Sequence, residues 1–176
     1  MESLWRKETG EIKARESQGN QKYDVIVIGA GMAGILTAYY LQEAGKKVLV
    51  LEAKSIASGQ TEGTTAKITS QHGLKYRKLL RYVGREKAEG YAKAHEEAIK
   101  EYERLINKLG IDCQFEKTTA YLYATVDERV LKREVKAATL LGIDAFYREK
   151  TELPFPVLGA VGFRKQARFQ PLEFLK

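Results

Sequence analysis

The sequence predicts an α/β fold that begins as a parallel β-α-β unit and continues as an α+β region with antiparallel strands. Over residues 23–52, two apolar β-branched runs flank a segment with helical spacing, and a glycine-rich turn follows the first run. Beyond residue 113 the apolar residues recur at every second position, which is typical of half-buried antiparallel strands. The passage near residue 71 from the parallel unit to a region of helices and antiparallel strands indicates a second layer of architecture.

The β-α-β unit is predicted from three consecutive segments. Tyr23–Ile28 is the kind of β-branched run that forms a parallel strand buried on both faces. Met32–Ala44 has apolar residues at helical spacing, and Gly45 follows where a C-cap glycine belongs. Lys47–Glu52 is a second buried strand, and the crossover between the strands is expected to be right-handed.

The rest of the chain alternates helices and strands. Residues 53–69 are rich in Ser, Thr and Gly, so we expect a loop, and its length indicates a functional role. Helices are predicted at 86–109 and 127–141, strands at 114–117, 120–125, 145–148 and 160–168, and a stiff connection at 153–156.

The glycine turn carries the clearest chemical signal. Gly29, Gly31 and Gly34 match the GxGxxG pattern directly after a strand and at the start of a helix. The first glycine permits a tight turn, the second lets the backbone approach a diphosphate, and the third allows close packing of helix on strand. Amide groups at the helix N-terminus favour an anion. The intervening residues that complete the candidate site are Ala30, Met32 and Ala33.

An acidic residue at the end of the second strand strengthens the prediction of dinucleotide binding. Glu52 lies 18 residues beyond Gly34, where a carboxylate can accept hydrogen bonds from the adenosine ribose hydroxyls. Ala53 and Lys54 follow it and are included in the candidate site. The negative charge disfavours NADP, because it repels a 2′-phosphate. FAD and NAD both remain open, since both present an ADP end.

Composition and charge exclude several other classes of function. The net charge is +7 and the pI is near 9.3, but acidic residues interrupt the basic ones, so we expect a solvated basic face and no nucleic-acid site. Cys113, the single cysteine, is expected to be a buried structural thiol. His95 falls on an apolar helical stripe and is more typical of a packed residue than of a ligand, so no metal site is predicted.

Location is predicted from two segments. Residues 1–22 lack the apolar core of a secretion signal. Residues 25–41 are too short for a membrane span and are interrupted by glycines. No membrane span is therefore predicted, and the default expectation is a cytoplasmic protein.

Several segments together resemble a known family. They are Ser3–Trp5, Tyr23–Gly34, Val48–Ala53, Gly59–Thr69 and Gln71–Gly73. The chain resembles the flavin-binding D-amino-acid oxidase and glycine oxidase superfamily, in particular the branch often fused to a C-terminal Rieske iron-sulfur domain. The resemblance implies FAD as cofactor and an amine or amino acid as substrate, oxidised by hydride transfer to the flavin.

The resemblance also implies roles for residues of the loop. Thr64 and Thr65 would lie near phosphate oxygens, followed by Ala66, while Lys67 and Thr69 would come closer to the flavin ring. The chain departs from the family at Glu62 and Gly63, where members commonly carry a basic residue. A carboxylate facing the diphosphate would weaken binding, so Glu62 is expected either to point away or to reduce affinity.

The sheet of the first unit is predicted to be incomplete, because one parallel partner strand is evident for the first strand. We therefore expect the N-terminal part of a longer enzyme, with a C-terminal half or complementing chain still to be supplied. The expected parts are an extension (1–22), the FAD-binding unit and flavin loop (23–70), a helical segment (71–109), a partial substrate domain (110–170) and the start of a return to the FAD domain (171–176).

Two alternatives to a flavin oxidoreductase remain from the sequence. One is a non-catalytic dinucleotide-binding fragment or one chain of a split enzyme, and the other is an NAD-linked dehydrogenase. No residue is assigned as a catalytic acid or base, because the paired groups that would indicate one are not visible.

Overall fold

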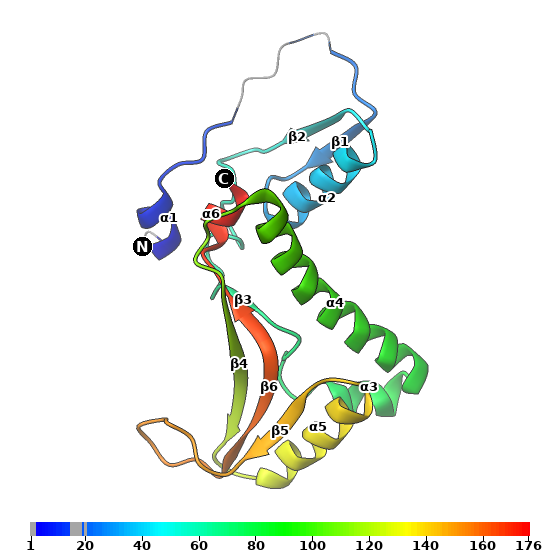
Figure 1. Ribbon diagram of the computed structural model, residues 1–176, viewed down its shortest axis with the longest axis vertical. Coiled ribbons are helices and arrows are strands. Elements are labelled where there is room, and N and C mark those ends of the chain that lie inside the picture. The colour runs from blue at the N-terminus through cyan, green and yellow to red at the C-terminus, as the bar shows by residue number, and fades with distance from the viewer. Residues whose placement is uncertain (1–2, 15–18, 20) are drawn as a thin grey trace. The chain divides into compact units, whose positions relative to one another are not determined.

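A computed structural model describes residues 3–14, 19 and 21–176 of the chain (Figure 1). The predicted extension 1–22 therefore lies partly outside the described residues. The chain divides into two compact units. The first comprises the chain up to Ala66 together with Ile111–Cys113 and Gln170–Lys176, and the second comprises Lys67–Gly110 and Gln114–Phe169.

The first unit contains the predicted β-α-β arrangement. Strand β1 (Val25–Ile28) pairs in parallel with β2 (Val48–Leu51), with Val25 opposite Val48 and Ile28 opposite Leu51. Helix α2 (Met32–Glu43) connects them. Two short helices complete the described part of this unit, α1 (Leu4–Thr9) and α6 (Pro171–Leu175), and they contact one another.

One face of the two-stranded sheet is covered by α2 and the other is open. The side chain of Val27 points toward the helix, where its Cγ1 lies 3.5 Å from the position of a Cβ on Gly34. Ile26 and Ile28 point to the opposite face and are 57% and 87% exposed. A parallel sheet normally has both faces covered, so an apolar face of this unit is without a cover in the described residues.

The second unit is an antiparallel sheet with three helices. Strand β6 (Gly159–Arg168) pairs with β4 (Glu116–Ala124) along its length and also with β3 (Lys67–Ile68) and β5 (Ala145–Arg148). The helices are α3 (Tyr76–Tyr82), α4 (Arg85–Leu109) and α5 (Glu128–Leu140). This mixture of a parallel β-α-β unit and an antiparallel sheet is the fold class that the sequence predicts.

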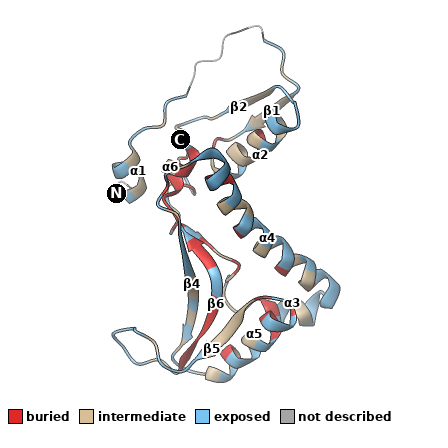
Figure 2. Cartoon of the chain, in the orientation of Figure 1, coloured by how far each residue is buried: buried red, intermediate tan, exposed pale blue. Residues whose placement is uncertain are grey.

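The core of the second unit lies between β6 and the helices. Most of β6 is buried, as Figure 2 shows, whereas α4 presents much exposed surface. Tyr76, Leu131, Val161 and Phe163 are each exposed by 1% or less and belong to a single apolar cluster. The Glu134 carboxylate of α5 accepts hydrogen bonds from the amides of Tyr76 and Arg77 at 2.6 and 3.1 Å, so α5 supplies an anion at the start of α3.

The structure differs from the sequence predictions in three local details. The strands predicted at 114–117 and 120–125 form one strand, β4, whose register shifts between Thr118 and Ala120. The expected loop 53–69 ends in β3, because two of its residues pair with β6 far along the chain. Within the predicted helical segment 71–109, α3 forms an additional helix before the predicted one, and Gly84, with a φ of 80°, lies between them.

Cys113 is expected from the sequence to be buried, and His95 is expected to be a packed residue. Cys113 is 1% exposed, so its predicted burial is confirmed. The His95 ring packs against Tyr91, with ring centroids 4.3 Å apart, and its centroid lies 5.0 Å from that of the His72 ring.

In the described part of the chain, no helix combines the length and apolarity needed to cross a bilayer.

Candidate dinucleotide site

The glycine turn lies where β1 ends and α2 begins. Gly29 has a φ of 99°, a conformation that side chains rarely adopt, and its amide donates to the Leu51 carbonyl at 2.7 Å. A Cβ on Gly31 would lie 3.2 Å from the Thr61 hydroxyl, and a Cβ on Gly34 would overlap the Gly29 carbonyl oxygen. Gly29 is therefore required by its backbone conformation, Gly34 by the lack of space for a Cβ, and a Cβ at Gly31 would be in close contact with Thr61.

Glu52 joins the end of β2 to the glycine turn. One carboxylate oxygen accepts the Ala30 amide at 2.8 Å and the other accepts the Lys54 amide at 2.9 Å. The Ala30 amide, followed by the Lys54 amide, holds the pKa of the Glu52 carboxyl below its ordinary value. A carboxylate oxygen has more than one acceptor position, so both oxygens retain capacity for ligand hydroxyls.

A cavity of about 450 Å³ opens beside this carboxylate. Its walls combine apolar side chains of α2, β2 and the following loop with the polar groups of Glu52 and Lys54. The N-terminal segment contributes one side. The lining residues are Glu11, Ile12, Lys13, Ala14, Ala30, Ile35, Leu49, Val50, Leu51, Glu52, Lys54, Ser55 and Ile56. The cavity therefore combines an apolar wall with charged groups, as a site for the adenosine end of a cofactor requires.

Thr61 is a residue of this site that sequence reasoning missed. Its hydroxyl accepts the Met32 amide at 3.0 Å, so it caps the N-terminus of α2 from a position 29 residues away. Nearby, the Ala57 amide donates to the Ala30 carbonyl at 2.9 Å. The Ser/Thr/Gly-rich composition of residues 53–69 was the available signal, but composition does not say which hydroxyl reaches the helix.

Some of the predicted site residues of the first unit contact one another and others do not. Glu52 joins the glycine turn and Lys54 through backbone hydrogen bonds, whereas Ala33 and Ala53 are exposed. In the loop, Thr64 accepts the Ala66 amide through its own hydroxyl at 3.3 Å, an ordinary turn contact. Thr65 is exposed, and Ala66 is 4% exposed with a φ of 58°.

Lys67 and Thr69 belong to the second unit. Lys67 is exposed and pairs with Arg168 on β6. The Thr69 hydroxyl donates to the Gln166 side-chain oxygen at 2.9 Å, and the buried Ser70 amide donates to the same oxygen at 2.7 Å. Ser70 also donates through its hydroxyl to Glu96 at 2.6 Å, so Thr69 begins a buried polar network within this unit.

Glu62, which departs from the family pattern, is neutralised within its own unit. Its carboxylate accepts two hydrogen bonds from the Arg6 guanidinium, at 2.9 and 3.1 Å. The side chains of Arg6 and Glu62 are 12% and 25% exposed. Arg6, 56 positions earlier in the chain, therefore compensates the charge of Glu62.

Residues 24–176 match the family model described as FAD dependent oxidoreductase. The chain belongs to this family. Membership in the FAD dependent oxidoreductase family decides between FAD and NAD in favour of FAD, as the resemblance implied.

One relative of the chain carries a different name. YhfW of Bacillus subtilis, named as a Rieske 2Fe-2S iron-sulfur protein, is 34% identical over 177 residues, which cover 99% of this chain and 35% of YhfW. The chain therefore spans about a third of the length of this relative.

The solved structures of two enzymes share the fold of this chain. Glycine oxidase from Bacillus cereus has a TM-score of 0.61 at 22% identity, covering 88% of this chain and 42% of that chain. L-amino acid deaminase from Proteus vulgaris has a TM-score of 0.70 at 21% identity, covering 94% of this chain and 39% of that chain. At these identities the likeness concerns the fold alone.

Proposed function

We propose that this chain is the FAD-binding N-terminal part of an oxidoreductase that oxidises amines or amino acids. The contact between Glu52 and the Ala30 amide carries the proposal, because it joins the ribose-binding acid to the glycine turn. The same acid lines the cavity of about 450 Å³. A sugar acceptor, a cavity with an apolar wall and a helix N-terminus thus lie within the first unit.

The residues present fit the adenine dinucleotide end of FAD. Glu52 would accept hydrogen bonds from ribose hydroxyls, and the apolar side chains of Ile35, Leu49 and Leu51 would flank the adenine. The Met32 amide donates to Thr61, and the next first-turn amides of α2, those of Ala33 and Gly34, have no partner inside the helix and would receive the diphosphate. Gly31 leaves room for the Thr61 hydroxyl at this helix end, because a Cβ there would lie 3.2 Å from it.

The reaction that we propose is removal of a hydride from a carbon that bears an amine. When bound, FAD would accept the hydride and its two electrons, leaving an imine that water hydrolyses. The names of the structural neighbours, glycine oxidase and L-amino acid deaminase, support an amine or amino acid as substrate. The name of YhfW supports a Rieske domain as a partner elsewhere in the full protein.

We also propose that a further segment of the protein, or a complementing chain, covers the open face of the first unit. Ile26 and Ile28 on that face support this proposal. The isolated chain would then bind FAD weakly and oxidise no amine. For function we propose an FAD-binding unit and flavin loop at 23–70 and a partial substrate domain at 110–170. This division differs from the two compact units, the second of which begins at Lys67.

The visible spectrum of purified protein tests the proposed function. The chain should be expressed with and without the downstream coding region, and flavin absorbance recorded before and after anaerobic addition of amino acids. We expect bound yellow flavin that bleaches with substrate in the extended protein. A colourless extended protein that takes up no added FAD would refute the proposal, and FAD binding without bleaching by any amine would refute the substrate class.

A further inference from the structure

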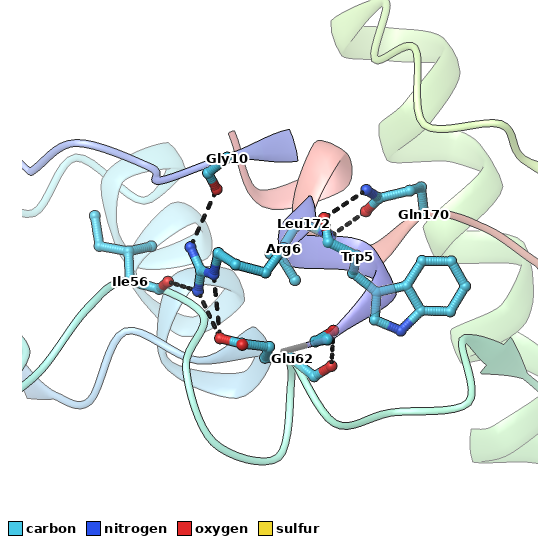
Figure 3. A network of polar contacts seen from close by, with 8 residues as sticks. Trp5, Arg6, Gly10, Ile56, Glu62, Gln170 and Leu172 are labelled. Atoms are coloured by element: carbon cyan, nitrogen blue, oxygen red, sulfur yellow. Dashed lines mark hydrogen bonds and ion pairs between the residues drawn. The ribbon is translucent and has the colours of Figure 1, made fainter. Parts of the chain in front are cut away.

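Helix α1 holds the loop that follows the ribose acid. The Arg6 guanidinium donates to the Ile56 carbonyl at 2.9 Å as well as to the Glu62 carboxylate (Figure 3). The Ser3 hydroxyl donates to the Glu62 carbonyl at 2.7 Å, and the Trp5 indole N–H donates to the Thr64 carbonyl at 2.9 Å. Three side chains of the N-terminal segment therefore satisfy three loop carbonyls and one carboxylate.

These contacts matter because residues 53–66 form neither helix nor strand. Carbonyl groups in such a segment need partners from elsewhere, and each buried carbonyl without a partner costs free energy. The partners here come from one short helix, so the conformation of the loop depends on the position of α1.

Helix α1 is in turn held by Gln170. The Gln170 amide nitrogen donates to the Trp5 carbonyl at 3.2 Å and to the Thr9 hydroxyl at 2.6 Å. Its oxygen accepts the Leu172 amide at 2.7 Å and so caps α6 (Figure 3). The loop, α1 and α6 are thus joined by side-chain hydrogen bonds within one unit.

The position of Glu62 gives the arginine a second role. Glu62 directly follows Thr61, whose hydroxyl contacts the first amide of α2. We infer that Arg6 is a positioning residue of the dinucleotide site, which fixes the loop at Ile56 and neutralises Glu62 beside the diphosphate. This inference rests on the proposed function, because it requires a diphosphate at the N-terminus of α2.

The expected size of the charge effect follows from Coulomb's law. A free carboxylate at an assumed distance of about 10 Å from two phosphate charges weakens binding about fourfold in a water-like dielectric. Loosening of the loop adds an ordering cost on binding, so we expect a total loss of roughly tenfold when Arg6 is removed. The charge part should shrink in high salt, whereas the ordering part should not.

Titration of the chain with FAD tests this inference through a double-mutant cycle. The variants are Arg6→Gln, Glu62→Gln and the combination of both. The controls are Arg85→Gln, Glu89→Gln and their combination, because Arg85 and Glu89 form an exposed Arg–Glu pair at 2.6 Å on α4. FAD affinity would be measured by flavin fluorescence at low salt and in about 1 M NaCl.

We expect R6Q to weaken FAD binding roughly tenfold at low salt. E62Q should strengthen binding by up to about fourfold, because the unpaired Arg6 charge attracts the diphosphate. The double variant should recover to within about threefold of the unmodified chain, because the uncompensated charge is gone. The Arg85 and Glu89 variants should match the unmodified chain. An R6Q variant with unchanged affinity, or a double variant as weak as R6Q, would overturn the role of Arg6 in charge compensation.

Hydrogen exchange without cofactor separates this inference from the proposed function. Amides within residues 53–66 should exchange at least about tenfold faster in R6Q than in R85Q. Equal rates in the two variants would overturn the contact between Arg6 and the loop. If the unmodified protein binds no FAD while R6Q still loosens the loop, the proposed function and the diphosphate role fail, and the loop contact stands.

Discussion

The hydroxyl oxygen of Thr61 lies 3.0 Å from the backbone nitrogen of Met32, so a loop residue caps the helix that follows the glycine turn. Gly31, the residue before this helix, has no side chain that could cap it. The loop is thereby attached to the helix end at which a diphosphate would bind. This contact leads to the first of five predictions.

Replacement of Thr61 by alanine should destabilise the chain by about 1 kcal/mol, because the Met32 amide loses its acceptor. Thr61→Ser keeps the hydroxyl and should stay within about 0.5 kcal/mol of the unmodified chain. Guanidinium unfolding followed by circular dichroism measures both. Equal stability of the alanine and serine variants would show that this hydrogen bond does not stabilise the helix.

Replacement of Gly34 by alanine should destabilise the chain by about 2 kcal/mol or more, because the new Cβ would overlap the Gly29 carbonyl oxygen. Gly90→Ala is the matched control. It lies in α4, no atom lies within 4 Å of its Cβ position, and the change should stabilise by up to about 1 kcal/mol. The two variants should shift the melting temperature in opposite directions, and a Gly34→Ala shift that is zero or upward contradicts the close packing of α2 on β1.

Replacement of Glu52 by glutamine should reduce both FAD affinity and stability at neutral pH. A glutamine has one carboxamide oxygen, so it cannot accept from both the Ala30 and Lys54 amides in the way a carboxylate does. The loss of FAD affinity should be about tenfold, which corresponds to one charge-assisted hydrogen bond. FAD titration checks this, with Glu97→Gln on the exposed face of α4 as the control.

The pH dependence of the same variant follows from the lowered pKa of Glu52. A carboxyl whose pKa is lower in the folded chain contributes stability above the unfolded value, and this stability is lost as pH falls through the folded pKa. The difference in stability between the unmodified chain and Glu52→Gln should therefore be largest near neutral pH. It should decrease as the pH falls well below 4.5. A difference that does not change with pH would contradict the hydrogen-bonded carboxylate.

His72 of the second unit should titrate below its ordinary pKa. Burial, then the neighbouring His95, then Lys75 lower the pKa of His72 below 6.5. Its neutral form is favoured in the folded chain, so this stability is present above 6.5 and is lost as pH falls through the folded pKa. NMR titration should show a His72 pKa that rises in His95→Gln but stays below 6.5, because burial remains the larger cause. An unchanged His72 pKa in that variant would contradict the contact between the two rings.

Local patterns account for the parts of the fold that were predictable. The β-α-β unit could be recognised because strand and helix periodicity and the spacing of Gly29, Gly31 and Gly34 are expressed within about thirty consecutive residues. The antiparallel character of the second unit followed from an apolar residue at every second position. The extent of β4 was harder to predict, because its irregularity between Thr118 and Ala120 depends on pairing with β6.

The sequence by itself determined the glycine turn, the acid at Glu52 and the identity of a dinucleotide-binding unit, since each depends on residues close together in the chain. Only the tertiary structure decided that Thr61 caps α2 and that Arg6 neutralises Glu62, across separations of 29 and 56 residues. Loop carbonyls and carboxylates take their partners from whatever the folded chain brings near them. No periodic pattern in the sequence indicates these hydrogen-bond partners, because they are determined by which polar groups lie close together in the folded chain.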